Sequence, residues 1–93
     1  MTVHRQRQTK ADMDHLSAIH VFIRVVETGS ITRAAAALSL PKSSASKLLA
    51  VLEEALQVKL LNRTTRAMSL KPEGAKYYQE VAPLVARLGE VEA

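Results

Sequence analysis

Apolar residues recur at a helical period in several stretches of the chain, and the most regular stretch covers residues 42–56. Its apolar side chains fall at spacings of three, one, three and four residues: Ala45, Leu48, Leu49, Leu52 and Leu56. This spacing predicts an amphipathic helix over 42–56. A shorter, alanine-rich stretch predicts a helix over 31–38, and the tight turn Ser39-Leu40-Pro41 joins the two.

A third helix is predicted over 14–28, where Asp14 is a suitable N-cap. Its apolar positions follow the same period: Leu16, Ile19, Phe22, Ile23, Val25 and Val26. Gly29 stands where a left-handed residue ends a helix, and Ser30 follows as the N-cap of the next one. The small residues at 34–37 favour a close approach between helices, although helix propensity alone would also explain them.

The last helix is predicted to open at Pro72, because proline is tolerated at the first helical position. One apolar stripe consists of Tyr78, Val81, Val85 and Leu88, and it is widened by Tyr77, Leu84 and Val91. A small domain cannot cover a terminal helix this apolar, so we expect it to pack against a partner helix. Pro83 should kink or interrupt the helix.

Residues 58–70 predict a small β-hairpin, or wing. Apolar segments around Leu60-Leu61 and 68–70 flank a polar, basic tip. At this tip, Arg63, Thr64 and Arg66 are placed for contact with phosphate or with a minor groove. A solvated loop is the alternative, and the basic charge around the tip favours the contact.

The helix over 42–56 has a second face of small or cationic side chains: Lys42, Ser43, Ser46, Lys47 and Ala50. Most of them lie in the first two turns, where the positive end of the helix also favours phosphate. Small residues let a backbone approach DNA, and hydroxyls and amines reach base edges, as a helix in the major groove requires. Taken alone, this helix leaves open the alternative of an ordinary core helix with a solvated face.

The chain carries a formal net charge of +4, which is unevenly distributed. Residues 30–71 hold seven lysines and arginines against two glutamates, whereas residues 72–93 hold two against four glutamates. Basic charge concentrated around the helix pair and the wing is typical of a nucleic-acid-binding surface. Residues 1–12 are polar and basic without periodicity, and predict a disordered extension. A vector remnant, an upstream start codon and a basic arm that touches phosphate all remain open as its origin.

Composition excludes several other classes. Cysteine is absent, which rules out a disulfide framework and a thiolate metal site and suits a reducing, cytoplasmic setting. No apolar run is long enough to span a membrane, and the N-terminus does not resemble a signal peptide. His15 and His20 do not share a helix face, so no metal site is expected. The serines at 43, 44 and 46 have no paired histidine and carboxylate, so neither catalysis nor a cofactor is expected.

These elements predict a mainly α chain with a helix-turn-helix pair, a small β-hairpin or wing, and a long last helix, after a disordered basic extension over 1–12. A winged helix that binds protein is the alternative function. Its recognition face would be apolar or acidic, whereas the face predicted here is made of lysine, serine and alanine.

An ordered, ungapped set of short motifs runs through residues 13–93. It consists of Phe22-x-x-Val25-Val26-Glu27-x-Gly29-Ser30-Ile31-Thr32, then Ala34-Ala35 with Leu38, Ser43 to Lys47 followed by Leu52-Glu53, Leu60-Leu61-Asn62-Arg63-Thr64-Thr65-Arg66, and Leu70 with Gly74. This set resembles the N-terminal DNA-binding domain of LysR-type transcriptional regulators. The resemblance implies a mainly α winged helix-turn-helix, with a three-helix core, a small β-hairpin wing and a long C-terminal linker or dimerisation helix. The division that it implies is the disordered basic extension over 1–12, a DNA-binding domain over 13–71 and the linker helix over 72–93. The resemblance implies sequence-specific binding of double-stranded DNA by a bacterial regulator, with the helix over 42–56 in the major groove. The wing tip, 62–67, would lie on the backbone or in the minor groove.

The resemblance also implies roles for particular residues and partners. The expected contacts are Lys42, Ser43, Ser46 and Lys47 from the recognition helix, Ser30, Thr32 and Arg33 from the preceding helix, and Arg63, Thr64 and Arg66 from the wing. A homodimer would form through Tyr78, Val81, Val85 and Leu88 of the last helix and would read an interrupted inverted repeat. A small-molecule inducer would bind only to a C-terminal effector domain that is absent from these residues.

Three residues depart from the family pattern. Gln57 stands where a glycine usually ends the recognition helix, so it must accept a left-handed conformation or shift the helix end. Pro41 replaces a common capping serine, and Lys71 replaces the usual threonine cap before the last helix, where Pro72 partly compensates. These departures concern helix boundaries and remove none of the expected DNA contacts.

Overall fold

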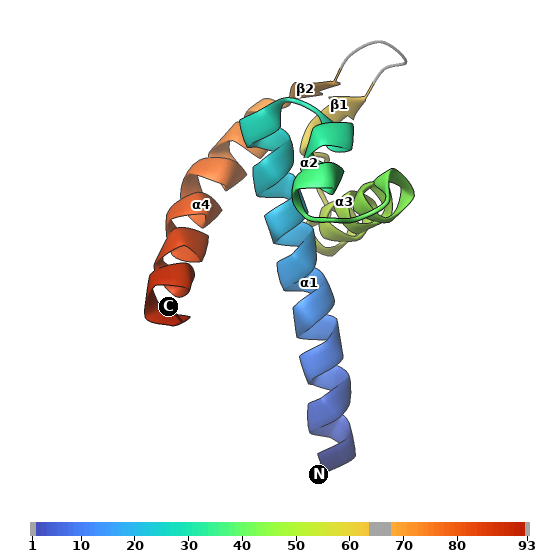
Figure 1. Ribbon diagram of the computed structural model, residues 1–93, viewed down its shortest axis with the longest axis vertical. Helices are drawn as coiled ribbons and strands as arrows, with labels where there is room; N and C mark the ends of the chain where they lie inside the picture. The colour runs from blue at the N-terminus through green and yellow to red at the C-terminus, as the bar shows by residue number, and fades with distance from the viewer. Residues whose placement is uncertain (1, 64–67, 93) are drawn as a thin grey trace.

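The helices and strands follow one another in the order that the sequence predicts. The computed structural model describes the backbone of residues 2–63 and 68–92, and within those ranges the side chains from His15 onward. Over this part of the chain there are four helices and one two-stranded antiparallel sheet (Figure 1): α1 (Thr2–Thr28), α2 (Ile31–Ala37), α3 (Lys42–Leu56), β1 (Leu61–Arg63), β2 (Met68–Leu70) and α4 (Pro72–Glu92). The prediction of a mainly α winged helix-turn-helix is confirmed.

The core is mostly aliphatic, with Phe22 as a buried aromatic residue, and is organised around α1. Figure 1 shows α1 running between α4 on one side and α2 and α3 on the other. The largest fully buried side chains are Phe22, Leu49, Leu52, Leu60, Val21 and Val25. Burying a side chain of this size contributes roughly 1.5–3 kcal/mol. The helix pair formed by α2 and α3 is therefore held by its apolar stripe against α1.

Alanines lie where the helices approach one another most closely. Ala18 of α1, Ala34 and Ala35 of α2 and Ala45 of α3 are all buried, whereas Ala36 and Ala37 are exposed. Only half of the alanine run in α2 thus faces the core. Its side chains are small enough for α2 to lie against both neighbours, which confirms the close approach predicted for this helix.

The N-terminal part of the chain differs from its prediction. α1 begins at Thr2, so the disordered extension predicted for 1–12 and the helix start at Asp14 are both wrong for the described residues. Residues 2–13 contain no glycine or proline, and half of them are the good helix formers Arg, Gln, Lys and Ala. Their lack of apolar periodicity means only that this part of α1 has no face for the core.

The junction between α1 and α2 follows the predicted pattern. Gly29 has a φ of 73°, in the left-handed region, and its amide donates to the Val25 carbonyl at 2.8 Å. The hydroxyl oxygen of Ser30 accepts a hydrogen bond from the amide of Arg33 at 3.1 Å. The glycine ends one helix and the serine caps the next, so the chain changes direction within two residues.

The first turn of α4 packs on the hairpin, and its C-terminal end projects from the rest of the domain. The amide of Lys71 donates to the Leu60 carbonyl at 3.0 Å, and Gly74 is buried against the same carbonyl. Pro83 lies inside α4, which continues to Glu92, so the predicted interruption does not occur. Pro83 is exposed, and water can therefore hydrate the carbonyl that loses its intrahelical donor. In Figure 1 the C-terminal end of α4 stands clear of the other helices.

Candidate nucleic-acid interface

The turn between α2 and α3 is tight and contains a left-handed residue. Ser39 has a φ of 57°, and the following amide, that of Leu40, donates back to the Ala35 carbonyl at 2.8 Å. Pro41 is extended, with φ −62° and ψ 149°. This geometry turns the chain sharply so that α3 begins directly beside α2. The sequence does not indicate the conformation of Ser39, because serine has no special preference for the left-handed region.

The first turns of α3 present the predicted polar face to solvent. α3 covers Lys42–Leu56, as predicted, and its N-cap residue Pro41 makes no side-chain hydrogen bond to the helix. Lys42, Ser43 and Lys47 are exposed, as is Ala50, and Ser46 is half-buried. An N-terminus without a side-chain cap leaves amide groups available to an external anion.

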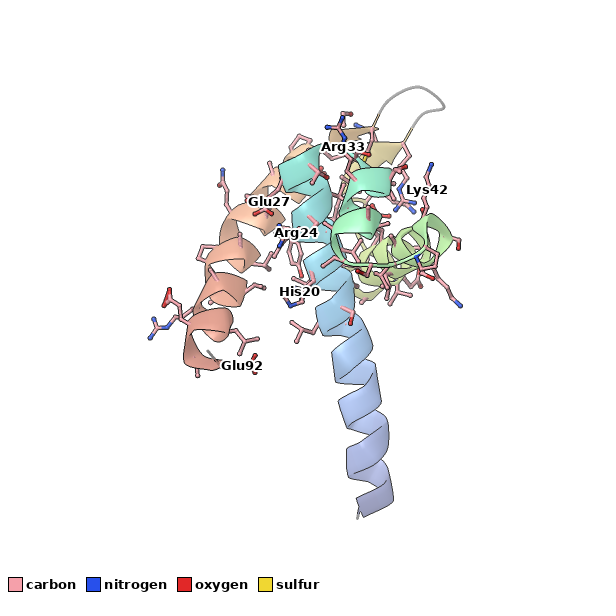
Figure 2. The ribbon with its side chains drawn as sticks, viewed as in Figure 1. His20, Arg24, Glu27, Arg33, Lys42 and Glu92 are labelled. Atoms are coloured by element: carbon pink, nitrogen blue, oxygen red, sulfur yellow. The ribbon has the colours of Figure 1, made fainter. Side chains whose placement is uncertain are left out.

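α2 adds exposed residues at the same end of the molecule. Thr32 and Arg33 are exposed, whereas Ser30 is half-buried and its hydroxyl oxygen caps α2. Arg33 and Lys42 lie in the upper part of Figure 2, the part in which the wing also lies. The structure therefore brings Arg33 of α2 and Lys42 of α3 to the end of the domain at which the wing lies, and Ser30 also caps α2.

The wing is a short ladder of three residue pairs. β1 pairs with β2 in antiparallel register, with Leu61 opposite Leu70, Asn62 opposite Ser69, and Arg63 opposite Met68. Arg63 closes the described part of β1, with its side chain 36% exposed. Thr64 and Arg66, the other two predicted wing contacts, lie outside the described residues.

Glu53 joins α3 to this wing. Its side chain is only 6% exposed, and its Oε2 accepts hydrogen bonds from the amides of Leu60 at 2.8 Å and Leu61 at 3.3 Å. The other oxygen, Oε1, lies 3.4 Å from Nη2 of Arg63 and 4.0 Å from Nζ of Lys59. One carboxylate thus holds the start of β1 and attracts two cations next to it.

Glu53 is not among the predicted site residues, although the helical pattern of the sequence indicates that its side chain is buried. Glu53 follows Leu49 by four residues and directly follows Leu52, so it lies within the buried arc of α3, whereas its neighbour Glu54 lies outside that arc. A carboxylate in such a position needs a partner. In the sequence analysis, Glu53 is used only as a residue of the family motif and as one of the two glutamates counted over residues 30–71.

The residues of the predicted dimer stripe of α4 differ in their exposure to solvent. Tyr78, Val81 and Val85 are half-buried, and Leu88 is 37% exposed. The most exposed large apolar side chains of α4 are instead Leu84 (66%) and Val91 (78%). Tyr77, expected to widen the stripe, faces Phe22 of α1, with ring centroids 5.6 Å apart and planes tilted by 55°.

A shallow groove of about 260 Å³ lies between α1 and α4. It is lined by His20, Ile23, Arg24, Glu27, Ala82, Val85 and Ala86. Figure 2 shows His20, Arg24 and Glu27 on the side of α1 that faces α4, and Arg24 lies 3.5 Å from Glu27 in an exposed ion pair. Val85 therefore faces this groove, while Leu84 is exposed elsewhere on α4.

Neither a metal cluster nor a membrane span is found in the described part of the chain. Among those residues, no three His, Asp or Glu side chains are grouped so that they could hold a metal ion. No helix within 2–63 or 68–92 is long and apolar enough to cross a membrane.

Three comparisons relate this geometry to known proteins. Residues 16–75 match the family described as bacterial regulatory helix-turn-helix protein, lysR family. The HTH-type transcriptional repressor PA14_22550 of Pseudomonas aeruginosa is 48% identical over 81 residues, which are 87% of this chain and 26% of that protein. The HTH-type transcriptional activator AaeR of Escherichia coli is 49% identical over 67 residues, which are 72% of this chain and 22% of that protein.

A solved structure shows the same arrangement of elements. The BenM_DBD/catB site 1 DNA complex has a TM-score of 0.77 at 33% identity, covering 82% of this chain and 84% of that chain. This chain spans about a quarter of the length of the two curated relatives. The matched residues run from α1 through the helix pair and the wing to the first turn of α4. The chain belongs to the LysR family of bacterial regulatory helix-turn-helix proteins.

Proposed function

We propose that this chain is the DNA-binding domain of a LysR-type transcription regulator and binds double-stranded DNA in a sequence-specific way. The observation that carries this proposal is the exposed N-terminal half of α3, where Lys42, Ser43 and Lys47 surround a helix end without a side-chain cap. A helix inserted in the major groove reads bases with side chains at this end. The likeness to a domain solved in a DNA complex supports the same reading.

Within this function, the residues fall into two groups. Lys42, Ser43, Ser46 and Lys47 would contact bases and nearby phosphates from α3, with Thr32, Arg33 and the partly buried Ser30 on the flanking backbone. Arg63, Thr64 and Arg66 would contact the backbone or the minor groove from the wing. The first group would supply sequence discrimination and the second would supply mainly affinity.

We also propose that the chain forms a homodimer through α4. Leu84, Leu88 and Val91 are exposed on α4 and follow one another at spacings of four and three on one side of the helix. A two-fold dimer places two copies of α3 one helical turn of DNA, or a multiple of it, apart. Its target would therefore be an interrupted inverted repeat.

The rest of the protein would supply the regulation. The curated relatives are about four times as long as the matched region, so an effector domain that binds a small-molecule inducer would follow α4 in the whole protein. The two relatives named above are a repressor and an activator, so the sign of regulation differs among close family members. A regulator of this kind would act in the cytoplasm, where the bacterial chromosome lies.

The experiment that tests DNA binding is fluorescence anisotropy over a series of salt concentrations. The purified chain would be titrated onto a duplex from the promoter region next to its own gene and onto a scrambled duplex of the same length. We expect a clear preference for the promoter and a steep loss of affinity with salt. An absence of binding to either duplex at low salt would overturn the proposal.

A further inference from the structure

Among the described side chains, Glu53 is the one buried residue that is polar or charged. Glutamate is rarely buried to this extent unless its charge is balanced by partners, because removing a carboxylate from water is costly. Glu53 is placed where its partners belong to the wing rather than to its own helix. The position of this carboxylate in the fold therefore suggests a task that links α3 to the wing.

Both oxygens of Glu53 are engaged, each with a different kind of group. Oε2 accepts from the amides of Leu60 and Leu61, and these residues are only 1% and 6% exposed, so water cannot readily replace the carboxylate. Oε1 lies near the cationic groups of Arg63 and Lys59. The amide contacts fix the backbone just before and at the start of β1, and the ion pair fixes the strand at its other end.

The wing has few other means of holding its position relative to α3. Its sheet has two strands of three residues, and an isolated hairpin of this size is marginal in water. On the opposite side, the Leu60 carbonyl is held by the amide of Lys71, and the Leu60 side chain is buried in the core. Those contacts connect the strand to α4 and the core, so the direct polar connection to the recognition helix is made by Glu53.

We propose that Glu53 is a positioning residue that sets the place of the wing relative to the recognition helix, and so allows both to contact one DNA duplex. This inference rests on the proposed DNA-binding function. Glu53 itself would touch no DNA. Its loss would lower DNA affinity by displacing the wing, while the residues of α3 that read bases would stay in place.

The test uses a pair of substitutions that keep the size of the side chain. Glu53→Met keeps its length but removes both acceptor oxygens, whereas Glu53→Gln keeps one acceptor for the two amides. Glu54→Met and Glu54→Gln are the matched controls, because Glu54 is the exposed neighbour and its replacement changes the charge of α3 equally. Should Glu53→Met not fold, Glu53→Asp takes its place with Glu54→Asp as control, because its shorter side chain cannot reach both amides.

Two measurements are made on each folded variant: hydrogen exchange of the Leu60 and Leu61 amides by NMR, and DNA affinity by anisotropy. In Glu53→Met we expect both amides to exchange at least about tenfold faster and the affinity to fall about tenfold below that of Glu54→Met. In Glu53→Gln we expect exchange and affinity to stay within about threefold of Glu54→Gln.

The outcomes separate this inference from the proposed function. Amides that stay protected in Glu53→Met, or an affinity equal to that of Glu54→Met, would overturn the positioning role. A loss in Glu53→Gln as large as that in Glu53→Met would also overturn it, because the retained acceptor would then have no effect. If the wild-type chain bound no DNA, the proposed function would fail, and with it the part of this inference that concerns affinity; the exchange data would still decide whether Glu53 holds the strand.

Discussion

Gly74 lies so close to the carbonyl oxygen of Leu60 that a β-carbon at position 74 would overlap it. The same β-carbon would lie 2.7 Å from Cδ1 of Leu70, so it would meet one backbone group and one side chain of the hairpin. The first turn of α4 can therefore pack on the wing only with glycine at this position. This contact, together with the Lys71–Leu60 hydrogen bond, joins the wing to α4.

Gly74→Ala should therefore destabilise the domain, by about 1–3 kcal/mol, because α4 or the hairpin must shift to make room. Gly89→Ala is the matched control, since Gly89 lies in the same helix and a β-carbon added there would have no neighbour within 4 Å. The control should be stabilised by up to about 1 kcal/mol, because alanine favours a helix. Urea unfolding of both variants measures the difference, and equal stabilities would show that the close approach has no energetic cost.

Gln57→Gly should raise stability by about 0.5–1 kcal/mol, because Gln57 ends α3 with a φ of 56° in the left-handed region that glycine adopts without strain. The gain is limited because the Gln57 side chain donates from Nε2 to the Glu54 carbonyl at 2.7 Å, a contact that glycine loses. Gln57→Ala keeps the strain and loses the contact, so it should be less stable than the wild type. Thermal unfolding that ranked alanine above glycine would contradict this account of the helix end.

Lys47→Ala should reduce discrimination between promoter and scrambled DNA by about 1–3 kcal/mol, if this exposed side chain reads a base. Arg66→Ala should instead weaken binding to both duplexes about equally and reduce the salt dependence by about one phosphate contact. Lys76→Ala removes the same charge from α4 and is the control for net charge. Anisotropy on both duplexes measures each effect, and identical behaviour of the first two variants would refute the division between reading and anchoring.

Leu84→Glu should shift the chain from dimer to monomer, because it places a charge on the exposed ridge formed with Leu88 and Val91. Gln79→Glu adds the same charge to an exposed position on a different face of α4 and should leave the dimer intact. Sedimentation velocity at several protein concentrations gives the assembly state. A dimer that survives Leu84→Glu but not Val85→Glu would place the interface on the groove side of α4 instead.

Tyr77→Phe should make the domain less sensitive to alkaline pH. Burial raises the pKa of the Tyr77 hydroxyl above the ordinary value of 10.0. The unfolded chain then loses this proton at a lower pH than the folded domain, so the contribution to stability is complete below about pH 10 and is lost as the pH rises through the folded-state pKa. Denaturant unfolding between pH 8 and pH 11 should show a smaller decline in Tyr77→Phe than in the wild type or in Tyr78→Phe, and equal declines would contradict the prediction.

The sequence predicts α2, α3 and the junctions around them well, for physical reasons. The bounds of α3 are those predicted, because its apolar stripe is regular and Pro41 restricts where the helix can begin. The caps at Gly29 and Ser30 are local as well, since each depends on the conformation of one residue and on hydrogen bonds within four positions. Such features follow from short stretches of chain.

Predictions from the sequence miss or misjudge features that depend on residues far away in the chain, or on whether a segment has any packing partner. Glu53 accepts from amides seven and eight positions later, and nothing in its own helix indicates that the strand returns to it. The assignment of Val85 to a dimer stripe stays a prediction: Val85 is half-buried beside α1, and periodicity does not show which part of a broad apolar face the domain itself covers. The prediction of disorder for 1–12 rests on the lack of a core-facing pattern, whereas α1 includes residues 2–12.

Because α4 continues through Pro83 without a break, a rotation at one end of this helix is transmitted to the other end. Its 21 residues span about 31 Å, nearly the length of one turn of the DNA double helix. Its first turn is fixed to the wing at Gly74, whereas its far end stands clear of the domain. A tilt of about 10° between the two ends would displace one end by about 5 Å, more than the roughly 3.4 Å rise of a base pair. A small change in the angle of α4 at its far end would therefore move the DNA-binding end by more than the spacing of one base pair.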